Sequence, residues 1–133
     1  RSSRDFHFPP PLVGATPFWL AARFTQPGMM RLLVKHGADP LVVHHSSYVL
    51  DNLKSRTEAT APLLAAMGMG GGTAWVQPAS GQRESLALET VRLMVELGAD
   101  VNAANAAGRT ALSAARALHY ESVVKLLMAK GAR

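Results

Sequence analysis

Apolar residues recur at helical spacing in three stretches of the chain, and each stretch runs into a glycine. The stretches read MMRLLVK, VRLMVE and SVVKLLMA, at residues 29–35, 91–96 and 122–129. An apolar position every three or four residues predicts an amphipathic helix, and Met29 and Met30 are expected in the core. The glycines that follow lie in HGADP, LGADV and KGAR. Glycine suits the left-handed residue that ends a helix, so the three helices are predicted to end alike.

A second phrase precedes each of these stretches and predicts a further, shorter helix. It reads TPFWLAA, TAPLLAA and TALSAAR, beginning at Thr16, Thr60 and Thr110. A threonine hydroxyl can accept a hydrogen bond from an orphan N–H group at a helix start, so each threonine is expected to cap a helix. Pro17 falls at the first helical position, where its missing N–H costs nothing. The alanine pairs in these phrases are small enough for two helices to approach closely.

The two phrases repeat in one frame, with additional residues in the middle of the chain. Gly98 and Gly131 are 33 residues apart, whereas Gly37 and Gly98 are 61 apart, a surplus of 28. The spacing of the threonine phrases divides this surplus into insertions of 17 and 11 residues. A helical pair that recurs with a fixed period cannot bury its apolar face alone, so the units are expected to stack.

These phrases resemble the ankyrin-repeat family, whose unit of about 33 residues opens with TPLHxAA and ends its second helix in Gly-Ala-Asp. The resemblance covers almost all of residues 14–133. Pro62 departs from the family pattern by lying one place late, and Trp19, Leu63 and Ser113 stand where the family usually has histidine. The resemblance implies an all-α, helix-turn-helix repeat solenoid with β-hairpin fingers.

On this interpretation, residues 1–133 form a single domain of three units. The units cover about 14–39, 60–100 and 110–133, and the insertions about 41–58 and 68–84. The second insertion includes most of MGMGGGTAWVQPASG, residues 67–81, whose glycines let the chain leave a helix. Ser80 is expected to cap the helix that follows, and Trp75 to anchor the insertion to the array.

Composition supports a packed domain and narrows its partners. The 133 residues are 48% apolar and include no cysteine, which excludes disulfides and thiolate metal sites. No apolar run reaches the roughly 18 residues of a membrane span, so no membrane partner is expected. The net charge is +5, but the basic residues are scattered among acidic ones, which argues against nucleic-acid binding. The chain begins at Arg1 rather than methionine, and we expect a trimmed or processed chain.

Candidate chemical sites lack the context that their chemistry requires. The glycine-rich residues 68–75 follow a helix and include no lysine, so we interpret them as an inserted loop rather than a phosphate-binding loop. His44 and His45 point in different directions on an extended chain, which disfavours chelation of one metal ion. No serine lies in a nucleophile elbow. We therefore predict no enzymatic activity, no cofactor and no metal.

The resemblance implies a protein partner on the concave face, which finger tips and the ends of the first helices form in such arrays. The residues expected to contact the partner are Arg23, Phe24, Arg56, Thr57, Met67, Trp75, Ala106, Ala107, Arg109 and Leu118. His44, His45 and Tyr48 in the first insertion, and Met69 in the second, are further candidates.

Two other functions remain open. In the first, the array is a structural wing of a larger polypeptide. The first helix carries Phe18 and Trp19, which further repeats, another subunit or the proline-rich lead-in would then cover. In the second, a small ligand binds under the insertion at 68–84.

Overall fold

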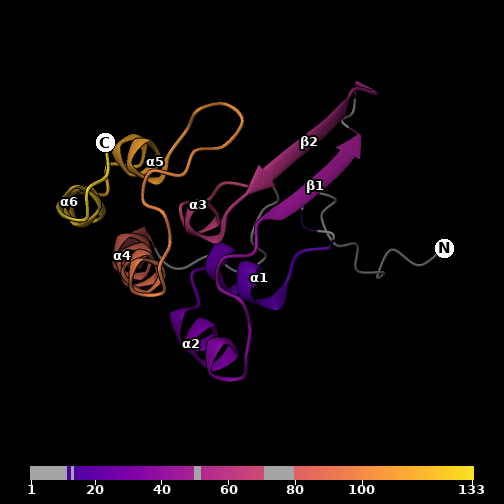
Figure 1. The fold of residues 1–133 in the computed structure, drawn as a ribbon. Coiled ribbons are helices and arrows are strands. Elements are labelled where there is room, and N and C mark those ends of the chain that lie inside the picture. Colours follow the sequence, from indigo (N-terminus) through magenta and orange to yellow (C-terminus); the bar gives the residue numbers. More distant parts are fainter. Residues whose placement is uncertain (1–11, 13, 50–51, 71–79) are drawn as a thin grey trace.

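Helices follow one another in pairs in the computed structural model, and a β-hairpin separates the first pair from the second (Figure 1). The structure describes residues 12, 14–49, 52–70 and 80–133. The elements in chain order are α1 (Pro17–Arg23), α2 (Pro27–Lys35), β1 (His44–Val49), β2 (Ser55–Thr60), α3 (Pro62–Ala66), α4 (Ser80–Glu96), α5 (Ala111–Ala117) and α6 (Glu121–Ala129). Besides contacts within each pair, α1 packs against α3, α2 against α4 and α4 against α6, so the pairs stack.

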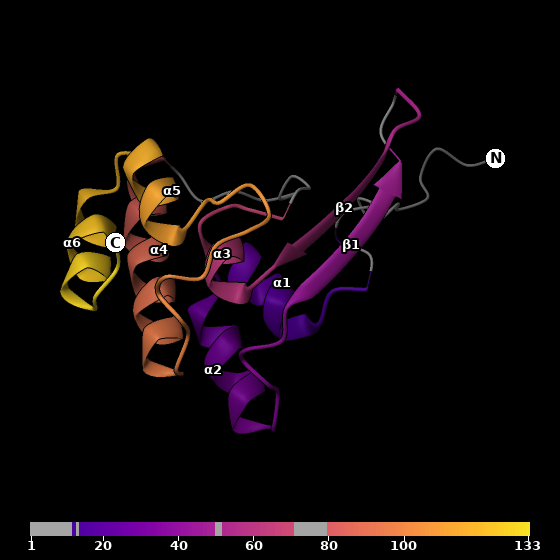
Figure 2. The same cartoon turned by 45° about the horizontal axis from the view of Figure 1, so that its top comes forward.

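The stacked pairs form a helical repeat fold, and the expected all-α class is too narrow. The strands β1 and β2 make a two-stranded antiparallel sheet, with His44 opposite Thr60 at its base. This hairpin lies almost entirely in the first expected insertion, 41–58, and it projects from the helices (Figures 1 and 2). The finger between α4 and α5 is shorter and carries an isolated bridge between Ala104 and Thr110.

The expected threonine caps form on α1 and α5. The hydroxyl of Thr16 accepts a hydrogen bond from the Trp19 N–H at 3.1 Å. Thr110 accepts from the Ser113 N–H at 3.2 Å, and Ser113 returns the bond in a capping box. The φ angles after the second helices are positive, as expected, at Gly37 (96°), Gly98 (97°) and Gly131 (94°).

The expected cap at Thr60 is wrong. Helix α3 begins at Pro62, and its N-cap residue is Ala61, which makes no side-chain capping bond. Proline fits the first helical position, so its late placement moves the helix start one residue along the chain. Thr60 is instead the last residue of β2, and its side chain is buried.

One apolar core runs through all three helix pairs. Its buried members include Phe18, Ala22, Met30, Leu64, Ala66, Val91, Met94, Leu112, Ala115, Val123 and Leu127. The alanines keep the first helices close to their neighbours, as the sequence predicts. The expectation that Met29 lies in the core is wrong, because its side chain is 50% exposed whereas Met30 is fully buried. Successive helical residues point about 100° apart, so only one of the two can face inward.

Trp19 joins the hairpin to the helices. Its indole N–H donates a hydrogen bond to the Thr60 carbonyl at 2.9 Å, and the ring is fully buried. The His44 ring lies against it, with centroids 4.7 Å apart. On another edge of the indole, a Cβ atom added to Gly70 would come within 2.6 Å of the ring. One side chain therefore fixes the base of both strands and the chain that leaves α3.

The two aromatic residues of α1 are covered by this chain itself. Phe18 belongs to the main core, and Trp19 forms a second apolar cluster with Leu12 and Ala65. The lead-in thus supplies part of the cover through Leu12, and the hairpin supplies His44 and Thr60. Their burial requires no further repeat and no other subunit.

A carboxylate from α4 caps the start of α6. Glu84 accepts hydrogen bonds from the Ser122 hydroxyl at 2.6 Å and from the Ser122 N–H at 3.0 Å. Tyr120, the N-cap residue of α6, makes no side-chain capping bond, so Glu84 satisfies an orphan N–H from outside the helix. The hydroxyl bond and then the backbone bond lower the pKa of Glu84, outweighing the opposing effect of desolvation.

This lowered pKa predicts a dependence of stability on pH. Charged Glu84 stabilises the fold above the ordinary glutamate pKa, and this contribution is lost as the pH falls through the lowered pKa of the folded state. In urea unfolding followed by circular dichroism, the wild-type chain should unfold at a higher midpoint than Glu84→Gln near neutral pH. The difference should be constant above the ordinary glutamate pKa of about 4.3 and should close progressively as the pH is lowered below it. An unchanging difference would contradict this role.

A pair of glycine variants tests the Trp19 contact. Gly68 and Gly70 both have positive φ, 90° and 101°, so alanine strains the backbone at either position. Only at Gly70 does the new Cβ also meet the Trp19 ring; at Gly68 it meets nothing within 4 Å. Gly70→Ala should therefore lower the free energy of unfolding by about 1–3 kcal/mol more than Gly68→Ala. Equal losses would show that the indole does not constrain this turn.

Candidate partner-binding groove

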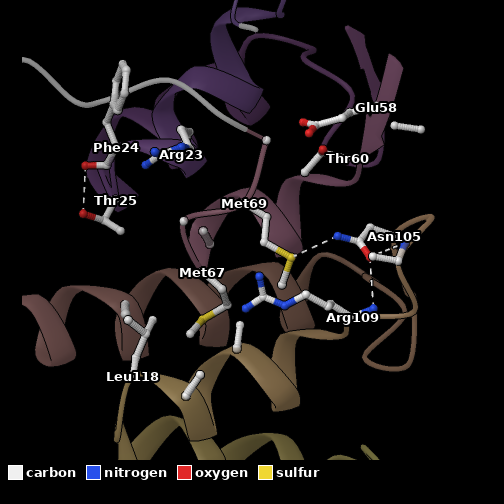
Figure 3. Close-up of a pocket in the computed structure, with 18 of the residues that line it drawn as sticks. Arg23, Phe24, Thr25, Glu58, Thr60, Met67, Met69, Asn105, Arg109 and Leu118 are labelled. Atoms are coloured by element: carbon white, nitrogen blue, oxygen red, sulfur yellow. Dashed lines mark hydrogen bonds between the residues drawn. The ribbon is translucent and has the colours of Figure 1, made fainter. Parts of the chain in front are cut away.

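A groove lies where the ends of the first helices meet β2 and the finger between α4 and α5 (Figure 3). Its volume is about 960 Å³. The lining residues come from every helix pair and from the hairpin. They are Arg23, Phe24, Thr25, Thr57, Glu58, Ala59, Thr60, Ala66, Met67, Gly68, Met69, Gly70, Arg83, Ala87, Asn105, Ala106, Ala107, Arg109, Ala114, Ala117, Leu118 and Tyr120.

The first helices all end in the same way and place an apolar side chain in the groove. Their C-cap residues are Phe24, Met67 and Leu118. Each is followed by a residue in the left-handed conformation, namely Thr25 (φ 51°), Gly68 (90°) and His119 (60°). This residue turns the chain away from the helix axis, and the C-cap side chain is left lining the groove.

Two methionines beyond α3 form part of the groove floor. Met67 and Met69 are 5% and 8% exposed, and Figure 3 shows both between Arg23 on one side and Arg109 on the other. The Asn105 amide approaches the Met69 sulfur at 3.8 Å, which ties the finger to this floor. Since methionine is unbranched and flexible, the floor can adapt its shape to what it contacts.

Asn105 also organises the finger. Its side-chain oxygen accepts hydrogen bonds from the N–H groups of Ala107 and Arg109, each at 3.0 Å. Its backbone N–H donates to the Arg109 carbonyl at 3.0 Å, and its carbonyl accepts from the Gly108 N–H at 2.9 Å. These bonds close a tight turn and fix the backbone of Arg109. The Arg109 side chain reaches from there toward Met67 and Met69 (Figure 3).

The opposite wall is formed by the end of α1. The Arg23 guanidinium lies 6.0 Å from the centre of the Phe24 ring, at the limit of a cation–π contact. The Thr25 hydroxyl donates to the Phe24 carbonyl at 2.8 Å. Desolvation lowers the pKa of Arg23, although arginine remains protonated in proteins. This wall therefore presents a partly buried positive charge beside an aromatic ring.

The charged side chains of the lining give the groove a positive character. Arg23, Arg83 and Arg109 come from α1, α4 and the finger, and Glu58 in β2 is the acidic residue of the lining. Each guanidinium can bind a carboxylate through two parallel hydrogen bonds. The arrangement thus combines apolar helix ends with cationic groups and suits a contact surface that is both apolar and acidic.

Most residues expected at the partner surface lie together in this groove. They are Arg23, Phe24, Thr57, Met67, Ala106, Ala107, Arg109 and Leu118. The backbone of Arg56 lies in β2 next to Thr57, and its side chain falls outside the described part of the structure. Trp75 also lies outside the described residues. That these residues contact a partner remains a prediction.

The candidates in the first insertion do not join the groove as a group. His44 is buried against Trp19 and is not available to a partner, whereas His45 is exposed on the other face of β1. The Tyr48 side chain falls outside the described part of the structure.

Sequence reasoning missed Arg83, Asn105 and Tyr120 as lining residues. For Asn105, an available signal was its place three residues before Gly108, which is typical of a turn. Among the described residues, no three His, Asp or Glu side chains are arranged to hold a metal ion. The described helices include none with the length and hydropathy of a membrane span.

Comparisons with known proteins found one family model and several relatives that resemble this chain. The sequence model described as "Ankyrin repeat" matches residues 13–45. The chain is 30% identical over 138 aligned residues to "Ankyrin repeat and SOCS box protein 6" of Homo sapiens, and equally similar to that of Pongo abelii. The protein of the same name from Mus musculus is 30% identical over 134 residues.

These matches cover almost the whole chain but little of the relatives. The alignment with the human protein includes 99% of this chain and 27% of the relative, and the mouse alignment includes 96% and 26%. The chain thus spans about a quarter of the length of these relatives. Ankyrin repeats are non-enzymatic modules that mediate protein–protein interaction. Residues 13–45 thus match an ankyrin repeat, and the chain is similar to ankyrin-repeat proteins along almost its whole length.

Proposed function

We propose that this chain is a protein–protein interaction module whose partner binds in the groove between the first-helix ends, β2 and the α4–α5 finger. The observation that carries the proposal is the convergence of three helix ends and two fingers on one cavity of about 960 Å³. Eight residues expected to contact a partner from the sequence are among its lining.

The types of side chain exposed in the groove are those that commonly contact another protein. Leu118 is 45% exposed although it is apolar, and Phe24 is partly exposed. Burying such side chains under a partner removes apolar area from water. Arginine, methionine and aromatic residues are also enriched in protein interfaces. The groove therefore offers both the area and the residue types of a binding surface.

Binding of a small ligand has less support. Pockets for small molecules usually include a few polar groups that point inward to orient the ligand. Among the described residues, no buried side-chain nitrogen or oxygen lacks a hydrogen-bond partner. An enzymatic role is disfavoured as well, since the described part of the lining includes no serine, cysteine or histidine. A protein segment, which uses apolar contacts and rim charges, fits this groove better.

A structural role within a longer polypeptide is the second candidate. One support is that the region aligned with this chain makes up only about 27% of the human relative's length. The other is that large apolar side chains are exposed on α2 and α6. These are Met29, Leu32 and Met128. Multi-angle light scattering of the isolated chain tests this role. A clean, stable monomer would count against it, whereas association through these helices would support it.

A matched pair of leucine variants tests the groove. Leu118 lines the groove and is 45% exposed, and Leu41 lies outside it and is 49% exposed. Either leucine can be changed to asparagine without creating a core cavity. If the partner covers Leu118, Leu118→Asn should weaken binding about tenfold or more, since burying a leucine stabilises by about 1.5–3 kcal/mol. Leu41→Asn should leave the dissociation constant within about twofold.

The measurement requires the natural partner. It can be captured by chemical crosslinking in the source cell, identified by mass spectrometry, and titrated against purified wild-type and variant chains by calorimetry. Circular dichroism should show the same unfolding midpoint for both variants. If Leu41→Asn weakened binding more than Leu118→Asn, the partner would bind elsewhere and the groove assignment would be wrong.

A further inference from the structure

We propose that the partner segment in this groove is an extended acidic stretch, in which a large apolar side chain is flanked by aspartate or glutamate. This inference rests on the proposed function and specifies its ligand. The apolar residue would contact the helix ends and the floor at Met67 and Met69, and a flanking carboxylate would meet Arg109.

Charge complementarity carries the inference. Among the described residues the lining includes three arginines and one glutamate, so negative charge on the partner would complement its positive character. The arginines come from three separate elements rather than from one exposed run. All three line one groove, and this distinguishes the site from the scattered basic residues elsewhere on the chain.

Arg109 is the best placed of the three for a carboxylate. Its backbone N–H and carbonyl are both hydrogen-bonded to Asn105, which fixes where the side chain begins. Within the described residues, its guanidinium has no acidic partner. It is exposed to solvent and extends toward Met67 and Met69 (Figure 3), so a ligand in the groove can reach it. A carboxylate that binds there gains a charge-assisted bond at little conformational cost.

The occupant is more consistent with a carboxylate peptide than with a phosphate-bearing ligand. Glu58 lies on the β2 wall, where it would repel a phosphate dianion more strongly than a single carboxylate. The aromatic residues of the lining are Phe24 and Tyr120, and Arg23 already lies near the Phe24 ring. A series of free rings on which bases could stack is therefore not present in the described lining.

Selection from random peptides tests the inference. A phage-displayed library of peptides of roughly 12 residues, long enough to cross a binding groove, is panned against the immobilised chain. We expect enrichment of sequences in which Asp or Glu lies within a few residues of Met, Leu or Phe. Synthetic versions of the selected peptides are then titrated against the wild-type chain at low and high salt, and affinity should fall as salt rises.

Two arginine variants locate the interaction. Arg109 lines the groove, and Arg92 is exposed on α4 outside it; neither has an acidic partner among the described residues. Because both changes to glutamine remove one charge, the comparison controls for net charge. Arg109→Gln should weaken peptide binding about tenfold or more, the loss expected for a charge-assisted hydrogen bond. Arg92→Gln should remain within about twofold of the wild type.

The outcomes separate this inference from the proposed function. If the selected peptides lack acidic residues but lose affinity with Leu118→Asn, the groove binds proteins and the acidic preference is wrong. If Arg92→Gln and Arg109→Gln weaken binding equally, the effect is one of overall charge and the inference also fails. If replacing the key Asp or Glu by phosphoserine tightens binding strongly, the groove recognises phosphate instead. If no selected peptide depends on Leu118, both the groove assignment and the inference fall.

Discussion

The hydrogen bond from the Trp19 indole to the Thr60 carbonyl is the interaction on which the arrangement of the groove depends. A two-stranded hairpin is marginally stable by itself, so its direction has to be fixed by packing. The buried indole does this at the base of both strands and, through Gly70, restricts the chain that follows α3. The tryptophan stands where the repeat family usually has a histidine, and this departure is what accommodates the inserted hairpin.

The groove itself arises from a feature that the repeats share. Each first helix ends in an apolar C-cap residue followed by a left-handed residue, so Phe24, Met67 and Leu118 all reach the same surface. The three side chains differ in shape and flexibility. The surface that they form is therefore irregular, although the backbone beneath it repeats. The fingers add charge and hydrogen-bonded order, chiefly through Asn105 and Arg109. Regular repeats thus position the groove, and residues outside the shared pattern determine its chemistry.

Much of this could be predicted from local rules. Helical periodicity, threonine caps and helix-ending glycines act over a few residues. They correctly placed the starts of α1 and α5 and the ends of α2, α4 and α6. The cap expected at Thr60 failed for a local reason, because Pro62 moves the start of α3 by one residue. The burial of His44 came from a long-range contact, with the Trp19 ring. The spacing of repeats brought eight site residues to one groove because C-cap and finger positions recur. It could not identify Arg83, since the role of this residue depends on which side chains meet across the stack. Asn105 acts within its own turn and could have been identified from its place before Gly108.

The capping of α6 by Glu84 has a consequence for how the array folds. Helix α6 starts without a capping side chain of its own, and the carboxylate that replaces it belongs to the preceding helix pair. The energy of adjoining pairs in repeat proteins is a sum of intrinsic and interface contributions. Here the capping hydrogen bond of α6 contributes to the interface between the pairs, rather than to the intrinsic stability of the pair α5–α6. The last pair is thereby made dependent on its neighbour, which favours cooperative folding of α4 and α6 over independent fraying of the end of the array.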